Sequence, residues 1–152
     1  MGRIFTVVGR DKTVMVCDSK TGTGTYRDYE STLMGSMYAV RDILKKISNT
    51  PVNKREDRYA ILIPDCITGI RKASTVNYWM QHKKSLRGTA LTMEFIGLAA
   101  DITSYMNNLD NVKILTGSKM YAGVYATQYR KAWATLGKIK PKVENQSIYM
   151  AK

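Results

Sequence analysis

The sequence YAILI occupies residues 59–63 of a chain of 152 residues and is apolar at every position. A strand with one solvated face alternates apolar and polar residues, whereas an unbroken apolar run is typical of a strand covered on both faces. Pro64 and Asp65 end the run. The run therefore predicts a central strand that is buried on both faces.

Two β-rich runs precede this strand: RIFTVV at residues 3–8 and TVMVC at residues 13–17. The turn residues Gly9 to Lys12 separate them, which is typical of a hairpin. Residues 25–29 add a third short strand. The first part of the chain therefore predicts an antiparallel meander.

Between the meander and the central strand, apolar residues recur at spacings of three and four, the pattern of one helix face. These residues are Leu33, Met37, Val40, Leu44 and Ile47. They predict a helix over residues 32–47. Later segments predict three more helices, at 67–84, 90–107 and 121–136, and one more strand, at 112–116. Gly137 is expected to be the C-cap of the last helix.

The predicted order is β-β-β-α-β-α-α-β-α, which places the fold in the mixed α/β (α+β) class, with a five-stranded mixed sheet and helices packed on it. We expect one domain over residues 1–137. We expect a basic, flexible tail over residues 138–152, because this segment contains Pro141 and several lysines. No apolar run reaches the length of a membrane span, and residues 1–8 lack the core of a signal peptide, so a cytoplasmic location is the expectation.

This element order resembles the ribonuclease H-like fold over about residues 3–136. The opening strand IFTVVG and the helix that begins ESTLMGSMYAV are similar to the first strand and first helix of that family. A further likeness is ILIPDCITGIRKA followed by NYWMQHKK. The family places an aspartate at the end of such a strand and a tryptophan late in the next helix. Asp65 occupies the place of that aspartate.

The resemblance implies nuclease chemistry only where about four carboxylates hold two Mg²⁺ ions roughly 4 Å apart. This chain has Val7 and Val8 where the first strand would carry an aspartate, and Thr32 near the place of a helix glutamate. Residues 118–143, which include the last helix, contain no Asp or Glu. Asp65 remains, and Asp is also a preferred helix N-cap. The resemblance therefore implies a degenerate, catalytically inactive member with no catalytic residue, metal or cofactor.

Charge is the strongest functional signal in the sequence. Twenty-four Lys and Arg residues face twelve Asp and Glu, which gives a formal net charge of +12 and a sequence pI near 9.8. Self-repulsion of this size destabilises a compact chain, so the charge indicates a polyanionic partner, above all nucleic acid. Two cysteines without a CxxC motif and a single histidine argue against a zinc site.

Two basic segments free of acidic residues predict the nucleic-acid contacts. The first follows Asp65 and comprises Arg71, Lys72, Lys83, Lys84 and Arg87. The second runs along the last helix and comprises Lys119, Tyr121, Tyr125, Arg130, Lys131, Lys138 and Lys140. Tyrosines among cations suit single strands, because bases stack on rings while phosphates meet Lys and Arg. The four-residue spacing of the tyrosines, which Tyr129 continues, is equally typical of a stripe packed on the sheet.

We therefore expect a non-catalytic protein that binds nucleic acid, with RNA or another single strand favoured over duplex DNA. Two alternatives stay open. One is a metal-dependent nuclease with rearranged carboxylates, for which the candidates are Asp11, Glu30, Asp65 and Asp101. The other is a viral adaptor or inhibitor that binds an acidic surface of a host protein. A homo-oligomer or a protein partner is compatible with each of them.

Overall fold

The computed structural model describes residues 2–10, 13–22, 24–28, 32–55, 57–63 and 89–145. The strands are β1 (Arg3–Arg10), β2 (Thr13–Asp18), β3 (Gly24–Asp28), β4 (Tyr59–Leu62) and β5 (Val112–Leu115). The helices are α1 (Thr32–Asn49), α3 (Thr89–Asn108) and α4 (Gly123–Asn145), with short 3-10 helices η1 (Val52–Lys54) and η4 (Gly117–Lys119). None of these described helices is long and apolar enough to cross a membrane.

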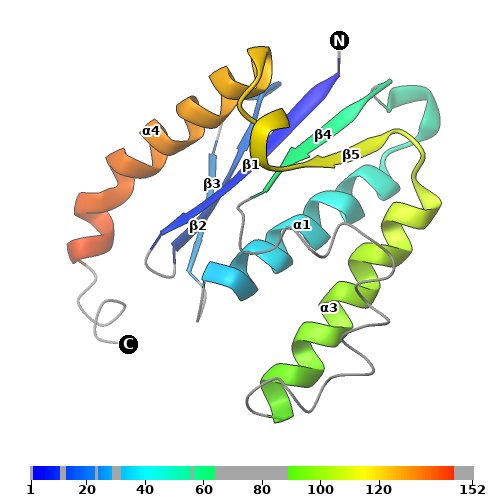
Figure 1. Ribbon diagram of the computed structural model, residues 1–152, viewed down its shortest axis with the longest axis horizontal. Coiled ribbons are helices and arrows are strands. Elements are labelled where there is room, and N and C mark those ends of the chain that lie inside the picture. Colours follow the sequence, from blue (N-terminus) through cyan, green and yellow to red (C-terminus); the bar gives the residue numbers. More distant parts are fainter. Residues whose placement is uncertain are drawn as a thin grey trace.

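The strands form one mixed sheet in the order β3-β2-β1-β4-β5 (Figure 1). β1, β2 and β3 are antiparallel neighbours, with Val7 opposite Val16 across the first hairpin. β4 and β5 run parallel to β1, and Ile61 of β4 pairs with Phe5 on one side and Ile114 on the other. The expected mixed α/β class and antiparallel meander are confirmed.

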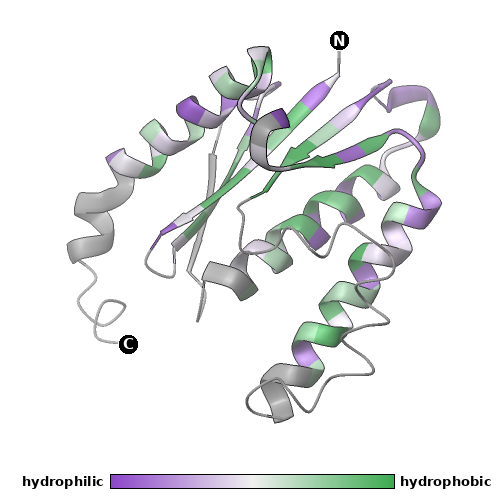
Figure 2. Ribbon diagram, viewed as in Figure 1, coloured by the Kyte–Doolittle hydropathy of each residue, from purple (hydrophilic) through white to green (hydrophobic). Residues whose placement is uncertain are grey.

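The central strand β4 is buried on both faces, as the sequence predicts. Alternate residues of a strand point to opposite faces. Tyr59 and Ile61 belong to the core cluster shared with α1 and α3, whereas Ala60 and Leu62 belong to a cluster on the α4 side. No residue of the run from Tyr59 to Ile63 is more than 6% exposed. Figure 2 shows the hydrophobic residues concentrated along these central strands.

The last helix differs from the expectation at both ends. α4 begins at Gly123 rather than at residue 121, and it continues through Gly137 to Asn145, so the predicted C-cap at Gly137 is wrong. Leu136 is 2% exposed and packs on the sheet. We infer that this burial offsets the roughly 1 kcal/mol that glycine costs inside a helix. Residues 138–145, expected in a flexible tail, are therefore helical.

Candidate nucleic-acid interface

Part of the expected interface falls outside the described residues. The helix predicted at 67–84 lies outside the described residues, and so does its basic cluster, which comprises Arg71, Lys72, Lys83, Lys84 and Arg87. So do residues 146–152 and three of the nuclease candidates, namely Asp11, Glu30 and Asp65. Lys140 belongs to α4, but its side chain is not among those described. The candidate site is therefore built from β5, η4 and α4.

The centre of β1, where a two-metal site would need an aspartate, is apolar. Val7 and Val8 are 0% and 1% exposed. Val7 shares a core cluster with Met34 and Met37 of α1. Within the described ranges, no group of three His, Cys, Asp or Glu side chains could hold a metal ion. Asp101, the remaining nuclease candidate, is exposed on α3.

α4 packs on β1 and β2, on the face of the sheet opposite α1 (Figure 1). Ala126 and Ala132 are 8% and 0% exposed, and short side chains at these positions let the helix approach the strands closely. Because this inner stripe fixes the rotation of the helix, the residues on its far side face solvent. Three cations are exposed there: Arg130, Lys131 and Lys138.

The tyrosines divide between packing and exposure. Tyr125 and Tyr129 are half-buried and pack against the cluster of β1, β4 and β5 residues beneath α4. Tyr121 is 55% exposed, and its ring meets Tyr129 edge-on at a centroid distance of 5.2 Å. The packing interpretation of the tyrosine stripe is therefore confirmed for Tyr125 and Tyr129. Tyr121 is exposed, and its contact with a nucleic acid stays a prediction.

Lys113 is an exposed cation that the sequence analysis missed. It lies in the edge strand β5, between the buried residues Val112 and Ile114. Lys113 and Leu115 are two residues apart in the strand, so their side chains point to the same face of the sheet. Leu115 packs in the cluster on the α4 side, and Lys113 therefore lies on the α4 side as well. A lone lysine in an apolar strand is the usual sign of an edge strand, and that signal was present in the sequence.

A groove runs beside Lys113, between β5 and the start of α4. It consists of two cavities of about 900 and 530 Å³, both lined by Lys113, Val124 and Tyr125. The larger cavity extends along the starts of β1 and β4, to Arg3 and Arg58. The smaller cavity extends to Lys119, Ala122 and Gly123. Val124 is 42% exposed and forms part of the groove wall.

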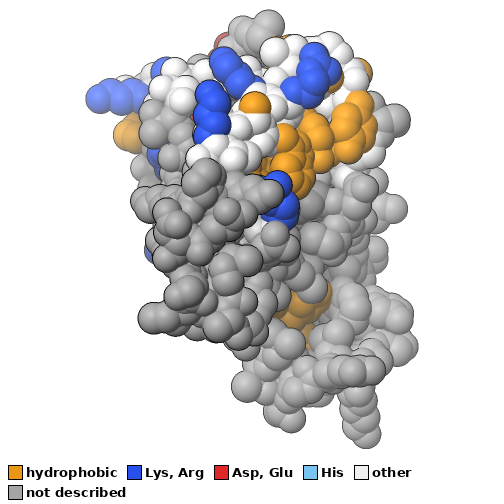
Figure 3. Space-filling view, turned by 90° about the vertical axis from the view of Figure 1, so that its left-hand side faces the viewer, with side chains coloured by type: hydrophobic (Ala, Val, Ile, Leu, Met, Phe, Trp, Pro, Cys, Tyr) orange, Lys and Arg blue, Asp and Glu red, His pale blue; other side chains and the backbone are white. Residues whose placement is uncertain are grey.

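We define the basic face as five exposed cations that the structure describes on β5, η4 and α4: Lys113, Lys119, Arg130, Lys131 and Lys138. Figure 3 shows Lys and Arg side chains around an apolar patch in the described part of the α4 side. The sequence of the α4 region adds a counter-charge only at Glu144, near the end of the helix, because residues 118–143 contain no Asp or Glu. α3 has the opposite character, with Glu94 and Asp101 and no Lys or Arg.

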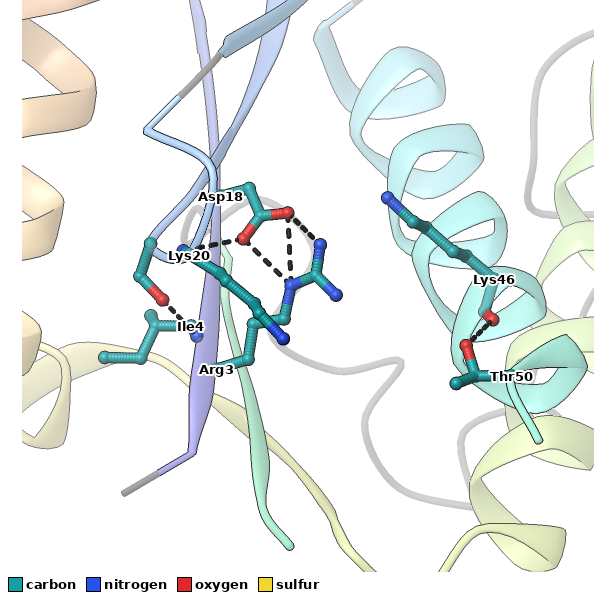
Figure 4. A network of polar contacts seen from close by, with 7 residues as sticks. Arg3, Ile4, Asp18, Lys20, Lys46 and Thr50 are labelled. Atoms are coloured by element: carbon teal, nitrogen blue, oxygen red, sulfur yellow. Dashed lines mark hydrogen bonds and ion pairs between the residues drawn. The ribbon is translucent and has the colours of Figure 1, made fainter. Parts of the chain in front are cut away.

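Arg3 lines the groove, but its charge is already balanced by Asp18 (Figure 4). The Arg3 Nε group donates to both Asp18 carboxylate oxygens, at 2.9 and 3.1 Å, and the Lys20 amide donates to Oδ1 at 2.9 Å. Burial alone would raise the pKa of the Asp18 carboxyl. The bonds from Arg3 and Lys20, with the positive charges of Arg3 and Lys46, outweigh burial and lower this pKa below its ordinary value. The pair ties the start of β1 to the end of β2.

Comparisons of the chain with protein-family models, with curated proteins and with solved structures find no match. A functional interpretation therefore depends on the basic face, the groove beside it and the sequence patterns that led to them.

Proposed function

We propose that this protein binds single-stranded nucleic acid, with RNA favoured, through the basic face and without chemical action on it. The observation that carries the proposal is the gathering of exposed cations on the α4 side, beside the exposed ring of Tyr121. A backbone of phosphates neutralises such a surface, and exposed bases stack on an aromatic ring.

Several contacts are needed, because a single exposed ion pair contributes only about 0–1 kcal/mol. Lys131 and Lys138 are seven residues apart on α4, which is two helical turns or about 10 Å along the axis. At that distance their mutual repulsion is largely screened at physiological salt. Repulsion between the two lysines therefore destabilises the free protein little, and both lysines can bind phosphates of one nucleic-acid strand.

We further propose that the core is a degenerate ribonuclease H-like domain. The described elements follow the order β-β-β-α-β-α-β-α, with residues 64–88 outside the description. This order supports the resemblance. The buried Val7 and Val8 of β1 support a member that binds without cleaving.

The test measures binding of labelled single-stranded RNA, single-stranded DNA and duplex DNA by fluorescence anisotropy over a range of salt concentrations. If six phosphates are neutralised, log K should fall against log salt with a slope of about −4 for single strands and about −5 for duplex. Single-stranded RNA should bind most tightly at every salt concentration. A slope near −1, or no binding at moderate salt, would overturn the proposal and favour a protein partner.

The same strands, incubated with Mg²⁺ or Mn²⁺, test the non-catalytic part of the proposal. We expect them to stay intact. Shortened strands that disappear in an Asp65→Asn variant would show instead a metal-dependent nuclease.

A further inference from the structure

We propose that the groove between β5 and α4 holds one unpaired nucleotide of the bound strand, with its base against Tyr125 and Val124 and a phosphate near Lys119. This inference rests on the proposed function and adds a specific subsite to it. None of the groove residues except Lys119 and Tyr125 was expected from the sequence.

The size and lining of the groove fit a nucleotide. The smaller cavity is an open depression of about 530 Å³, and the two cavities share Lys113, Val124 and Tyr125. Val124 is 42% exposed beside these cations. A planar base covers apolar and aromatic surface with its faces, while its phosphate stays at the charged rim. One nucleotide therefore satisfies both parts of the lining.

The charges along the groove give the nucleotide a direction. At the α4 end, Lys113 and Lys119 are exposed, and none of the described residues that line that cavity is acidic. At the other end, the exposed carboxylates of Asp57 and Asp110 line the wall together with the exposed cation Arg58, and Arg3 is paired with Asp18. A phosphate is therefore attracted more strongly to the first end, where no described carboxylate opposes the lysines, than to the second, where two carboxylates do. The base therefore points toward the starts of β1 and β4.

The groove discriminates between single strands and duplexes. A paired and stacked base must be unpaired and turned out of the helix before it can enter such a pocket, which costs a few kcal/mol. An unpaired base avoids most of this cost. The subsite thus gives a physical reason for a preference for single strands, which the lysines and arginines alone do not provide.

The test compares Val124→Glu with Thr127→Glu. Both positions are exposed on α4 one turn apart and both changes add one negative charge, but Thr127 lines neither cavity. The probe is a single-stranded RNA of about 12 nucleotides, a length that one such site can span. It carries 2-aminopurine, and a duplex of equal length is the comparison. Circular dichroism checks that both variants fold.

We expect Val124→Glu to weaken single-strand binding about tenfold more than Thr127→Glu, the range of one lost stacking contact. Duplex binding should change equally in the two variants. The 2-aminopurine fluorescence should be quenched on binding to the wild type and less so in Val124→Glu. If Val124→Glu does not fold, Lys113→Gln replaces it, with Lys45→Gln, at another exposed lysine on α1, as the control.

The outcomes separate the two proposals. If the wild type binds single strands with the expected salt slope but the two variants behave alike and the fluorescence does not change, the nucleotide subsite is wrong and surface binding stands. If the wild type does not bind single strands, both proposals fail.

Discussion

α3 and α4 are helices of 20 and 23 residues that lie on opposite sides of the same sheet. Both bury an apolar stripe: Ile102 of α3 is 0% exposed and Leu136 of α4 is 2% exposed. Their other residues differ in charge, because α3 carries two acidic residues and no cation, whereas α4 carries five Lys and Arg and one acidic residue. Packing thus sets the inner residues of both helices and leaves the outer ones free to meet a partner.

The largest expected effect concerns what the two helices share. Ile102→Ala on α3 and Leu136→Ala on α4 should each lower the free energy of unfolding by about 2–5 kcal/mol, because each removes a buried side chain and leaves a cavity. Urea denaturation measures both. We expect the salt slope of nucleic-acid binding to stay unchanged in whatever fraction remains folded. A loss below 0.5 kcal/mol, the size typical of surface changes, at either position would contradict the packing described for that helix.

The next effect concerns Arg3, a groove cation that is already paired. Asp18→Asn removes the partner of Arg3, and we expect the free energy of unfolding at pH 7 to fall by about 1.5–3 kcal/mol, the range for hydrogen bonds to charged groups. The pKa of Asp18 is lowered in the folded state. Its carboxylate therefore stabilises the fold above the unfolded pKa of about 3.9, and this stabilisation is lost as the pH falls through the lower folded pKa.

Denaturation of wild type and Asp18→Asn at several pH values measures this difference. The gap between the two proteins should be full at neutral pH and should close in acid. A gap that widens as the pH falls would mean that burial, rather than the Arg3 pair, dominates at Asp18.

A smaller effect distinguishes the exposed apolar surfaces on the two sides of the sheet. Tyr121 on the α4 side is 55% exposed and Met93 on α3 is 57% exposed. Tyr121→Ala should weaken binding of single-stranded RNA about fivefold or more, since a stacking ring is worth at least about 1 kcal/mol. Met93→Ala should leave it unchanged. Anisotropy titrations at one salt concentration measure the RNA affinity of both variants. Equal losses of affinity would show that Tyr121 has no special role.

The smallest effect concerns the two ends of the groove. The carboxylates of Asp57 and Asp110 line the end where the base is placed, and carboxylates accept hydrogen bonds from the amino group of a base such as cytosine. Uracil has no amino group. Oligomers of cytosine should therefore bind about two- to threefold more tightly than oligomers of uracil, less than the roughly 1–3 kcal/mol of a well-formed base contact. Competition titrations test the order, and a preference for uracil would contradict the direction proposed for the nucleotide.

Much of the fold could be predicted because its signals are local. The run from Tyr59 to Ile63 is apolar throughout, and it is buried throughout. The hairpin has β-rich runs on both sides of a turn, and β1 and β2 pair there from Phe5 to Arg10. The end of α4 could not be predicted from local signals. Gly137 is a local stop signal, yet the helix continues past it to Asn145, and Leu136, the residue before this glycine, is buried.

The candidate site was predicted only in part, because it depends on which segments the sheet brings together. The exposed cations of α4 follow from charge and helical spacing alone. The groove could not be predicted from the sequence, since its walls come from the starts of β1, β4 and β5 and from α4, which are far apart in the sequence. Lys113 matters only because the strand order leaves β5 at the sheet edge.

The most direct test removes two cations from each side of the sheet. Lys131→Gln with Lys138→Gln changes the basic face, and Lys45→Gln with Lys46→Gln makes the same change in net charge at exposed positions of α1. We expect the first pair to flatten the salt slope for single-stranded RNA by about 1.4 and the second pair to leave it unchanged. Equal changes in both double variants would contradict binding at the basic face.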